Sequence, residues 1–230
     1  MSSVKHRSSI KVDDFIAPEC HGQIAIVYQD EAIVVINKPT GLLSLSGKNP
    51  LNFDSVHYRL RQLFPTCLMV HRLDLGTSGL MVLALNKTVN AHLCKQFQDR
   101  KVEKQYVAVL AGHVQRPSGE ISAAISKDPD NFPVMKICAT TGKAATTTYR
   151  VLDYLDHPKR TRIAFTPLTG RTHQLRIHSR EFGHPIIGCD LYGSPETQAM
   201  ASRLLLHASD LTFMHPLTHA VLSFSCEADF

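Results

Sequence analysis

A short polar segment at residues 71–79 contains the residue best suited to covalent catalysis. It lies between two apolar runs and reads His71-Arg72-Leu73-Asp74-Leu75-Gly76-Thr77-Ser78-Gly79. Catalytic groups often lie on loops that a rigid scaffold positions. An ionised aspartate there can act as a nucleophile or remove a proton, although most isolated aspartates are solvated turn residues. Asp74 is therefore a candidate that needs support from other segments.

Two further segments place reactive side chains beside strand-like runs. Residues 170–178 contain two arginines and two histidines where a helix is expected to start. The ordinary interpretation is a charged helix face. A metal site is less favoured, because His173 and His178 are five residues apart and helical metal ligands usually lie four apart. In the other segment, Tyr106 begins an apolar run, where a tyrosine usually packs in the core with its hydroxyl at the edge.

The apolar pattern around these segments predicts many short strands and few helices. Strand-like runs occur at residues 24–28, 32–37, 68–74, 79–85, 105–112, 146–155, 162–168 and 220–226. Helical spacing occurs before Pro65, after Asn86, and from about Thr172 to Gly183. Short connections favour an α+β fold, with a mixed, largely antiparallel sheet and flanking helices and loops. Residues 1–20 are predicted to be a weakly ordered tail, and residues 21–230 a single domain.

The composition argues against several classes of protein. The chain has 230 residues and is 43% hydrophobic, which is enough for a core. No run of about 18 apolar residues is present to cross a membrane. The six cysteines form no C-x-x-C pair, and the glycine motifs of nucleotide-cofactor folds are absent. A net charge of +5 is compatible with binding a nucleic-acid backbone but does not require it.

Four sequence blocks, in a fixed order, resemble the RluA family of pseudouridine synthases. They are Asn37-Lys38-Pro39-Thr40-Gly41-Leu42-Leu43, the segment around Asp74, residues 170–178, and Arg203-Leu204-Leu205-Leu206-His207-Ala208. Residues 43–47, 194–201 and 228–230 resemble the family member with dual rRNA and tRNA specificity. Gly76 departs from the alanine expected there. The resemblance extends from about residue 24 to Phe230, and it implies one pseudouridine-synthase catalytic domain with no added N-terminal RNA-binding domain.

The resemblance also implies a role for each site residue. Asp74 resembles the catalytic nucleophile, and Arg171 resembles the arginine that pairs with it. Tyr106 resembles the aromatic residue that stacks on the target base and can assist removal of the C5 proton. Arg72 resembles the side chain that enters the RNA stack in place of the flipped base. Leu206, in the last block, is expected to contact the substrate.

The expected reaction is isomerisation of uridine to pseudouridine in a 23S rRNA stem-loop and a tRNA anticodon stem-loop. The enzyme is expected to be a cytoplasmic monomer that needs no cofactor or metal. One alternative is a family member that modifies a different single tRNA or rRNA site. Another is a catalytically silent RNA-binding homologue, which would be expected to have lost Asp74, Tyr106 or Arg171. A glycoside-cleaving enzyme would need a second carboxylate, which the Asp74 segment does not supply.

Overall fold

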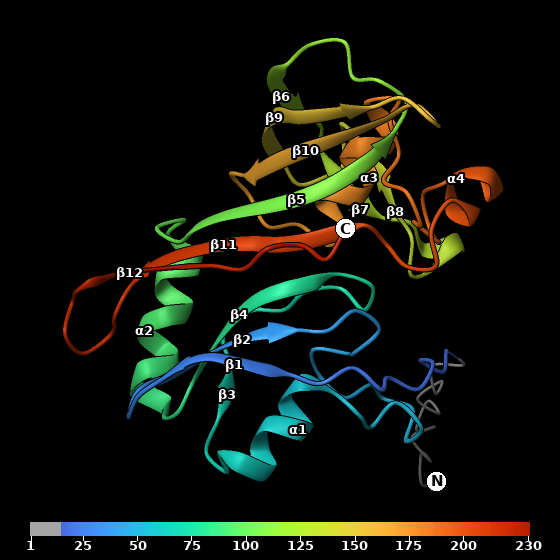
Figure 1. The fold of residues 1–230 in the computed structure, drawn as a ribbon. Helices are drawn as coiled ribbons and strands as arrows, with labels where there is room; N and C mark the ends of the chain where they lie inside the picture. Colours follow the sequence, from blue (N-terminus) through green and yellow to red (C-terminus); the bar gives the residue numbers. More distant parts are fainter. Residues whose placement is uncertain (1–14) are drawn as a thin grey trace, which may run out of the picture.

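A mixed 10-stranded sheet dominates the computed structural model, which describes residues 15–230 (Figure 1). The strand order is β1-β2-β4-β11-β5-β10-β9-β6, while β3 pairs with β4 and β12 with β11. Within the described residues, β4 and β11 are parallel and the other named strand pairs are antiparallel. The predicted α+β fold with a largely antiparallel mixed sheet is confirmed.

The helices and strands have the following bounds. The main sheet contains β1 (Ala25–Gln29), β2 (Ile33–Lys38), β3 (Leu68–Met69), β4 (Ser78–Ala84), β5 (Glu103–Ala111), β6 (Ser118–Ser122), β9 (Thr146–Leu155), β10 (Arg160–Pro167), β11 (Leu206–Met214) and β12 (Val221–Ser225). A separate hairpin consists of β7 (Ile125–Lys127) and β8 (Met135–Ile137). The helices are α1 (Val56–Leu63), α2 (Lys87–Gln98), α3 (Gln174–Glu181) and α4 (Pro195–Ala199), with a 3-10 turn at Pro129–Asn131.

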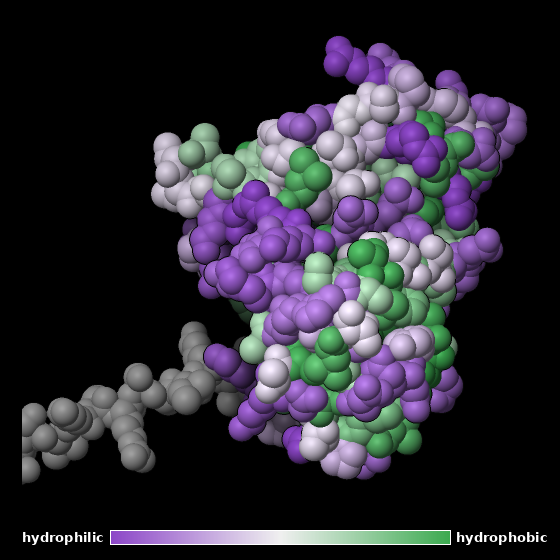
Figure 2. Space-filling view, turned by 90° about the vertical axis from the view of Figure 1, so that its left-hand side faces the viewer, coloured by the Kyte–Doolittle hydropathy of each residue, from purple (hydrophilic) through white to green (hydrophobic). Residues whose placement is uncertain are grey.

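The two halves of the sheet are covered differently. In β2, Ile33 faces a cluster that contains Leu93 of α2, and Val34 faces a second cluster that contains Leu60 of α1. Burial on both faces explains why β2 and β4 are almost continuously apolar. On the other half, α3 packs Leu175 into the cluster formed with β5 and β10. Figure 2 shows hydrophilic side chains gathered in a band across the middle of the face that carries α2.

Side-chain caps explain where two predicted helices begin. The Ser55 hydroxyl accepts a hydrogen bond from the Tyr58 N–H at the start of α1, and the Asn86 side chain accepts one from the Val89 N–H at the start of α2. Such caps satisfy N–H groups that lack a partner within the helix. The prediction for residues 68–74 is too long, because the strand there covers only Leu68–Met69.

The predicted N-terminal tail lies partly outside the described residues, which begin at Phe15. The Asn52 side chain donates a hydrogen bond to the Phe15 carbonyl and accepts one from the Ala17 N–H. Further along, the Arg59 guanidinium donates to the Cys20 carbonyl over 2.5 Å. Residues 15–20 are therefore tied to the loop before α1 and to α1 itself.

Candidate active site

The loop that carries Asp74 is held through its main chain. The Ser44 hydroxyl donates to the Leu73 carbonyl over 2.7 Å and accepts from the Leu73 N–H over 3.1 Å. Thr40 donates through Oγ1 to the Gly76 carbonyl over 2.8 Å. These bonds lie on both sides of Asp74 in the sequence. The segment at residues 37–44, which the sequence marked only by resemblance, is thus the support of the Asp74 loop.

Lys38 is the buried centre of this support. Its ammonium group donates to the carbonyls of Pro39, Leu42 and Leu75 over 2.9, 2.7 and 3.2 Å. Three acceptors match the three donors of a lysine ammonium group. The side chain is fully buried, and burial lowers its pKa to about 7 despite an opposing effect from the Asp74 charge. One side chain therefore joins the end of β2 to the peptide that follows Asp74.

On its C-terminal side, the loop enters β4 where that strand touches β11. Gly79 has a φ of +113°, and a Cβ built there would lie 2.3 Å from the Ala208 carbonyl oxygen, so only glycine permits this approach. Arg203 donates through Nη2 to the Ser78 hydroxyl over 2.5 Å. The Ser78 hydroxyl in turn lies 2.8 Å from Nδ1 of His207. Side chains from the last sequence block thus fix the start of β4.

The opposite wall of the site is the loop that leads into α3. The Gln174 Oε1 atom accepts hydrogen bonds from the Thr169 hydroxyl over 2.7 Å and from the Arg171 N–H over 3.0 Å. His173 has a left-handed backbone with a φ of 55°. The helix therefore begins at Gln174 rather than near Thr172. Arg171 consequently lies in the loop before the helix.

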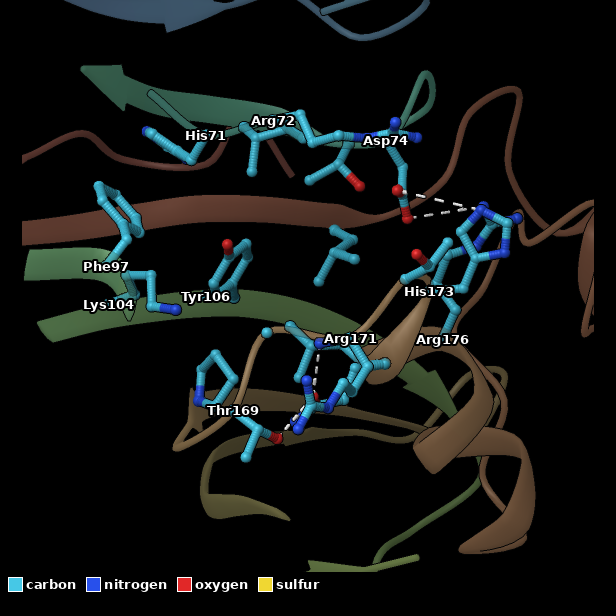
Figure 3. Close-up of a pocket in the computed structure, with 18 residues that line it drawn as sticks. His71, Arg72, Asp74, Phe97, Lys104, Tyr106, Thr169, Arg171, His173 and Arg176 are labelled. Atoms are coloured by element: carbon cyan, nitrogen blue, oxygen red, sulfur yellow. Dashed lines mark hydrogen bonds and ion pairs between the residues drawn. The ribbon is translucent and has the colours of Figure 1, made fainter. Parts of the chain in front are cut away.

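Two side chains of this wall approach the Asp74 carboxylate (Figure 3). Arg176 Nη1 lies 3.9 Å from Asp74 Oδ2, and His173 Nε2 lies 4.0 Å from Asp74 Oδ1. Arg171 instead donates through Nε to the Ala144 carbonyl over 3.1 Å. The expected pairing of Asp74 with Arg171 is therefore corrected: Arg176 occupies that position, because the delayed helix start turns residue 176 toward the carboxylate.

A tyrosine orients His173 from behind. The Tyr192 hydroxyl oxygen accepts a hydrogen bond from the Met135 N–H over 2.8 Å, and it lies 2.8 Å from Nδ1 of His173. The Tyr192 hydroxyl thus holds the imidazole ring through Nδ1, with Nε2 facing Asp74. Burial lowers the His173 pKa more than the Asp74 charge raises it. His173 is thus a neutral imidazole whose Nε2 faces the carboxylate.

The carboxylate opens into a cavity of about 300 Å³. Asp74, Arg72, Tyr106, Arg171 and Leu206, the residues singled out in the sequence, all line it. The Asp74 side chain is 21% exposed. Burial, followed by the Asp74 charge, raises the pKa of the Tyr106 phenol, so this phenol is protonated at neutral pH. The sequence candidates thus converge on one concave site.

Comparison with known proteins identifies the family of this chain. Residues 32–181 match the family model described as RNA pseudouridylate synthase. The chain belongs to this family. It is 46% identical over 205 residues to "Dual-specificity RNA pseudouridine synthase RluA" of Yersinia pestis, covering 89% of this chain and 99% of that protein. It is 44% identical over 207 residues to the protein of the same name from Escherichia coli strain K12, covering 90% and 94%.

A solved structure supports the same assignment. "Human RNA Pseudouridylate Synthase Domain Containing 1" superposes with a TM-score of 0.77 at 30% identity, covering 93% of this chain and 86% of that one. The predicted membership of the RluA family is therefore confirmed, and the chain is an RNA pseudouridine synthase. Within residues 15–230 there is no group of three or more side chains arranged to hold a metal. The same residues include no helix long and apolar enough to cross a membrane.

Sequence reasoning missed the residues at the far end of this synthase site. His71 stacks on Phe97 with 4.5 Å between ring centroids, and its Nε2 accepts from the Val82 N–H over 3.1 Å. Burial, followed by the Lys104 charge, lowers the His71 pKa to about 3, so the ring is neutral. Lys104 lies beside the same Phe97 ring, 5.9 Å from its centroid. Lys104 is two residues before Tyr106 and so lies on the same face of β5. This spacing could have identified Lys104 as a site residue from the sequence.

Proposed function

We propose that this enzyme isomerises uridine in a large-subunit rRNA stem-loop and in a tRNA anticodon stem-loop, with Asp74 as its catalytic carboxylate. The observation that carries the proposal is the position of the Asp74 carboxylate. It lies 3.9 Å from Arg176, in a cavity that Tyr106 also lines. The Yersinia pestis and Escherichia coli relatives are named as dual-specificity enzymes. RNA loops expose splayed bases, so two different RNAs can present the same local site.

The reaction is an isomerisation that consumes no co-reactant. The bond between the ribose C1′ and the uracil N1 breaks, the uracil turns, and its C5 bonds to C1′ while the C5 proton is lost and N1 gains one. Asp74 can attack C1′ or the uracil ring, or it can remove a ribose proton; each needs an ionised and oriented carboxylate. Arg176 supplies a fixed counter-charge for it, and His173 presents Nε2 to it.

The cavity accepts a uridine only after the base leaves the RNA stack. Tyr106 offers a protonated aromatic ring on which the base can stack, a contact worth about 1–3 kcal/mol. Because its phenol holds its proton, we assign Tyr106 to stacking rather than to removing the C5 proton. Leu206 closes the apolar side of the cavity. Arg72 is exposed and has no side-chain hydrogen bond or ion pair with residues 15–230, so it is available to replace the flipped base.

The enzyme is inferred to act as a cytoplasmic monomer without a cofactor. One chain supplies every wall of the cavity, from the Asp74 loop, α2, β5, the end of β10, the loop before α3, α3 itself and β11. The carboxylate, its counter-charge and the surface for base stacking all come from side chains of this chain. Activity is therefore expected to survive exhaustive chelation and dialysis, assayed on RNA whose folding is checked separately. Restoration of lost activity by a divalent ion would contradict this.

The proposed substrates are tested with purified protein, a short rRNA hairpin and an isolated tRNA anticodon stem-loop. Pseudouridine is expected in both hairpins with the wild type. Asp74→Asn is expected to lose at least about 10³-fold in kcat, while its RNA affinity stays within about tenfold, or about 1.4 kcal/mol. Wild-type turnover by Asp74→Asn would overturn the catalytic assignment. Modification of full-length tRNA outside the anticodon loop, with neither hairpin modified, would favour the single-site alternative.

A further inference from the structure

A second cavity of about 890 Å³ lies beside the uridine cavity. The two share six wall residues: Phe97, Lys104, Pro167, Thr169, Gly170 and Arg171. The remaining walls come from the turn after α2, the first residues of β5, the end of β10, and β11. This groove is on the side of α2, where Figure 2 shows hydrophilic side chains. Its volume is within the range of about 300–1,000 Å³ that is usual for ligand sites.

Lys104 stands on the boundary between the two cavities. Figure 3 shows its side chain directed into the space below Tyr106. Apart from the Phe97 ring, it has no hydrogen-bond or ion-pair partner among residues 15–230, although it is only partly exposed. Burial lowers its pKa. A partly desolvated cation without an anion is unfavourable, so the position is suited to an anionic group of the substrate.

The rest of the groove offers contacts for a nucleotide. Arg171 uses Nε to hold the Ala144 carbonyl, and its Nη groups have no partner among the described residues. Arg100 is exposed and forms no ion pair there. Two acids also line the groove: Glu103, which is exposed, and Asp210, which is only partly exposed.

The Asp210 carboxylate is already engaged. It accepts hydrogen bonds from the hydroxyls of Ser209 over 2.6 Å and of Ser225 over 2.7 Å. An exposed Leu168 and the shared Phe97 ring add apolar surface on which a base can lie. Cations at the boundary and apolar surface in the groove match a phosphate followed by a base.

We propose that this groove binds the nucleotide adjoining the target uridine in the RNA strand, with Lys104 and Arg171 on the phosphate that links the two. Arg100 contacts the next phosphate outward. Continuity with the uridine cavity identifies the occupant, because the nucleotide joined covalently to the bound uridine lies next to it and the two cavities share six wall residues. The inference rests on the proposed action on RNA hairpins, and it adds a subsite that reads the strand beside the uridine.

Single neutral methylphosphonate linkages test the role of Lys104. They replace the phosphate on either the 5′ or the 3′ side of the uridine in the hairpin, and KM is measured for wild type, Lys104→Gln and Lys104→Arg. Neutralising one of the two phosphates is expected to raise the wild-type KM by about tenfold, as for one charged hydrogen bond. The same change should raise the Lys104→Gln KM by less than about twofold, since the contact is already lost, while Lys104→Arg stays sensitive.

The proposal would be overturned if each neutral linkage raised the KM of wild type and the KM of Lys104→Gln by the same factor. A wild type that forms no pseudouridine in the unmodified hairpin would instead contradict the proposed substrate. In that case the same linkages are placed in the full-length RNA that the enzyme modifies, so the groove is still tested.

Arg100→Gln tests the outer part of the groove against a matched control. Arg150 is also exposed and without an ion pair among the described residues, but it lies on β9 and lines neither cavity. Arg100→Gln is expected to raise KM about threefold to tenfold on a long single strand, and not on an oligonucleotide ending one nucleotide beyond the uridine on the groove side. Arg150→Gln should change neither value. Equal KM effects of the two variants on the long strand would overturn the assignment of the groove.

Discussion

The two walls of the active site are held in different ways. On the Asp74 side, the contacts from Ser44, Thr40 and Lys38 all end on main-chain groups. On the α3 side, the contacts end on the functional side chains themselves: Tyr192 on the His173 ring, and Asp190 on the Arg176 guanidinium.

This difference separates two tasks of the protein. Fixing the backbone around Asp74 sets where the carboxylate is, while its oxygens stay open to substrate. Fixing the side chains of Arg176 and His173 sets which charge and which imidazole nitrogen face that carboxylate. Substitutions behind the first wall should therefore displace the carboxylate, and those behind the second should change its electrostatic surroundings.

Among substitutions in the two walls around Asp74, the largest effect is expected from Arg176→Met, compared with Arg171→Met. Removing the counter-charge of Asp74 should lower kcat by roughly 10²-fold or more, as for loss of one preorganised charge contact. Arg171→Met should mainly raise KM, because Arg171 lines the cavity without touching the carboxylate. Single-turnover and steady-state kinetics on the anticodon stem-loop measure both.

Folding must be controlled in this comparison, because Arg176 is buried and also pairs with Asp190. Thermal unfolding of each variant, and Arg176→Lys as the charge-retaining variant, provide that control. A kcat loss greater for Arg171→Met than for Arg176→Met would reverse the assignment of the two arginines.

Arg72→Ala should give the next largest effect, and one that depends on the substrate. Arg72 belongs to the Asp74 wall, yet its side chain has no anchor among residues 15–230. If it replaces the flipped base, its loss should cost about tenfold or more on a hairpin and about twofold on an unstructured oligonucleotide, because flipping costs least when the base is already unstacked. Equal losses on both RNAs would indicate a simple phosphate contact.

Lys38→Met should weaken the backbone support, with kcat falling by about tenfold through displacement of the Asp74 loop. It should also change how stability depends on pH. Folded Lys38 loses its proton near pH 7, whereas lysine in the unfolded chain keeps it to about 10.5. Between these values the unfolded chain binds more protons, so Lys38 makes the free energy of unfolding rise with pH, by up to about 1.4 kcal/mol per unit.

Urea unfolding of wild type and Lys38→Met at several pH values between 7 and 10.5 isolates this contribution. The free energy of unfolding is expected to rise more steeply with pH for wild type than for Lys38→Met. Lys48→Met, a change at an exposed lysine, should keep the wild-type slope. Parallel curves for wild type and Lys38→Met would show that Lys38 does not titrate in this range.

Tyr192→Phe should have the smallest effect, about fivefold in kcat, as for one hydrogen bond of about 1 kcal/mol. Without the hydroxyl, Nδ1 of His173 is free to take a proton, so the His173 pKa should rise; an NMR titration of the imidazole measures it. Tyr154→Phe, which removes a tyrosine hydrogen bond to the Val114 carbonyl, is the control and should change neither kcat nor the imidazole titration.

The sequence predicted the apolar strands better than it predicted the centre of the sheet. β2 and β4 were visible because burial on both faces makes them continuously apolar. β11 was not, because it contains the buried polar residues His207 and Ser209. The His207 ring contacts Ser78, 129 residues earlier, through Nδ1 and the Cys226 carbonyl, 19 residues later, through Nε2. The residues near His207 in the sequence give no sign of so distant a partner.

The same limit explains the arginine assignment. The sequence placed Asp74, Tyr106 and Arg171 at one site, and the cavity contains all three. Which arginine faces the carboxylate depends on where α3 begins, and the Gln174 side chain fixes that point through tertiary hydrogen bonds to the Thr146 carbonyl and the Thr147 hydroxyl. Helix signals in a sequence locate such a start only to within about one or two residues, which is the difference between Thr172 and Gln174.

The position of β11 between β4 and β5 has a consequence for synthesis on the ribosome. Those two strands emerge early, but the strand that joins them emerges more than 90 residues after β5 ends at Ala111. Until then each presents an unpaired edge, open to wrong partners. Asp74 and Tyr106, carried on opposite sides of that gap, cannot share a cavity before residues 206–214 arrive. A nascent chain is therefore unable to act on the ribosomal RNA around it until its fold is nearly complete.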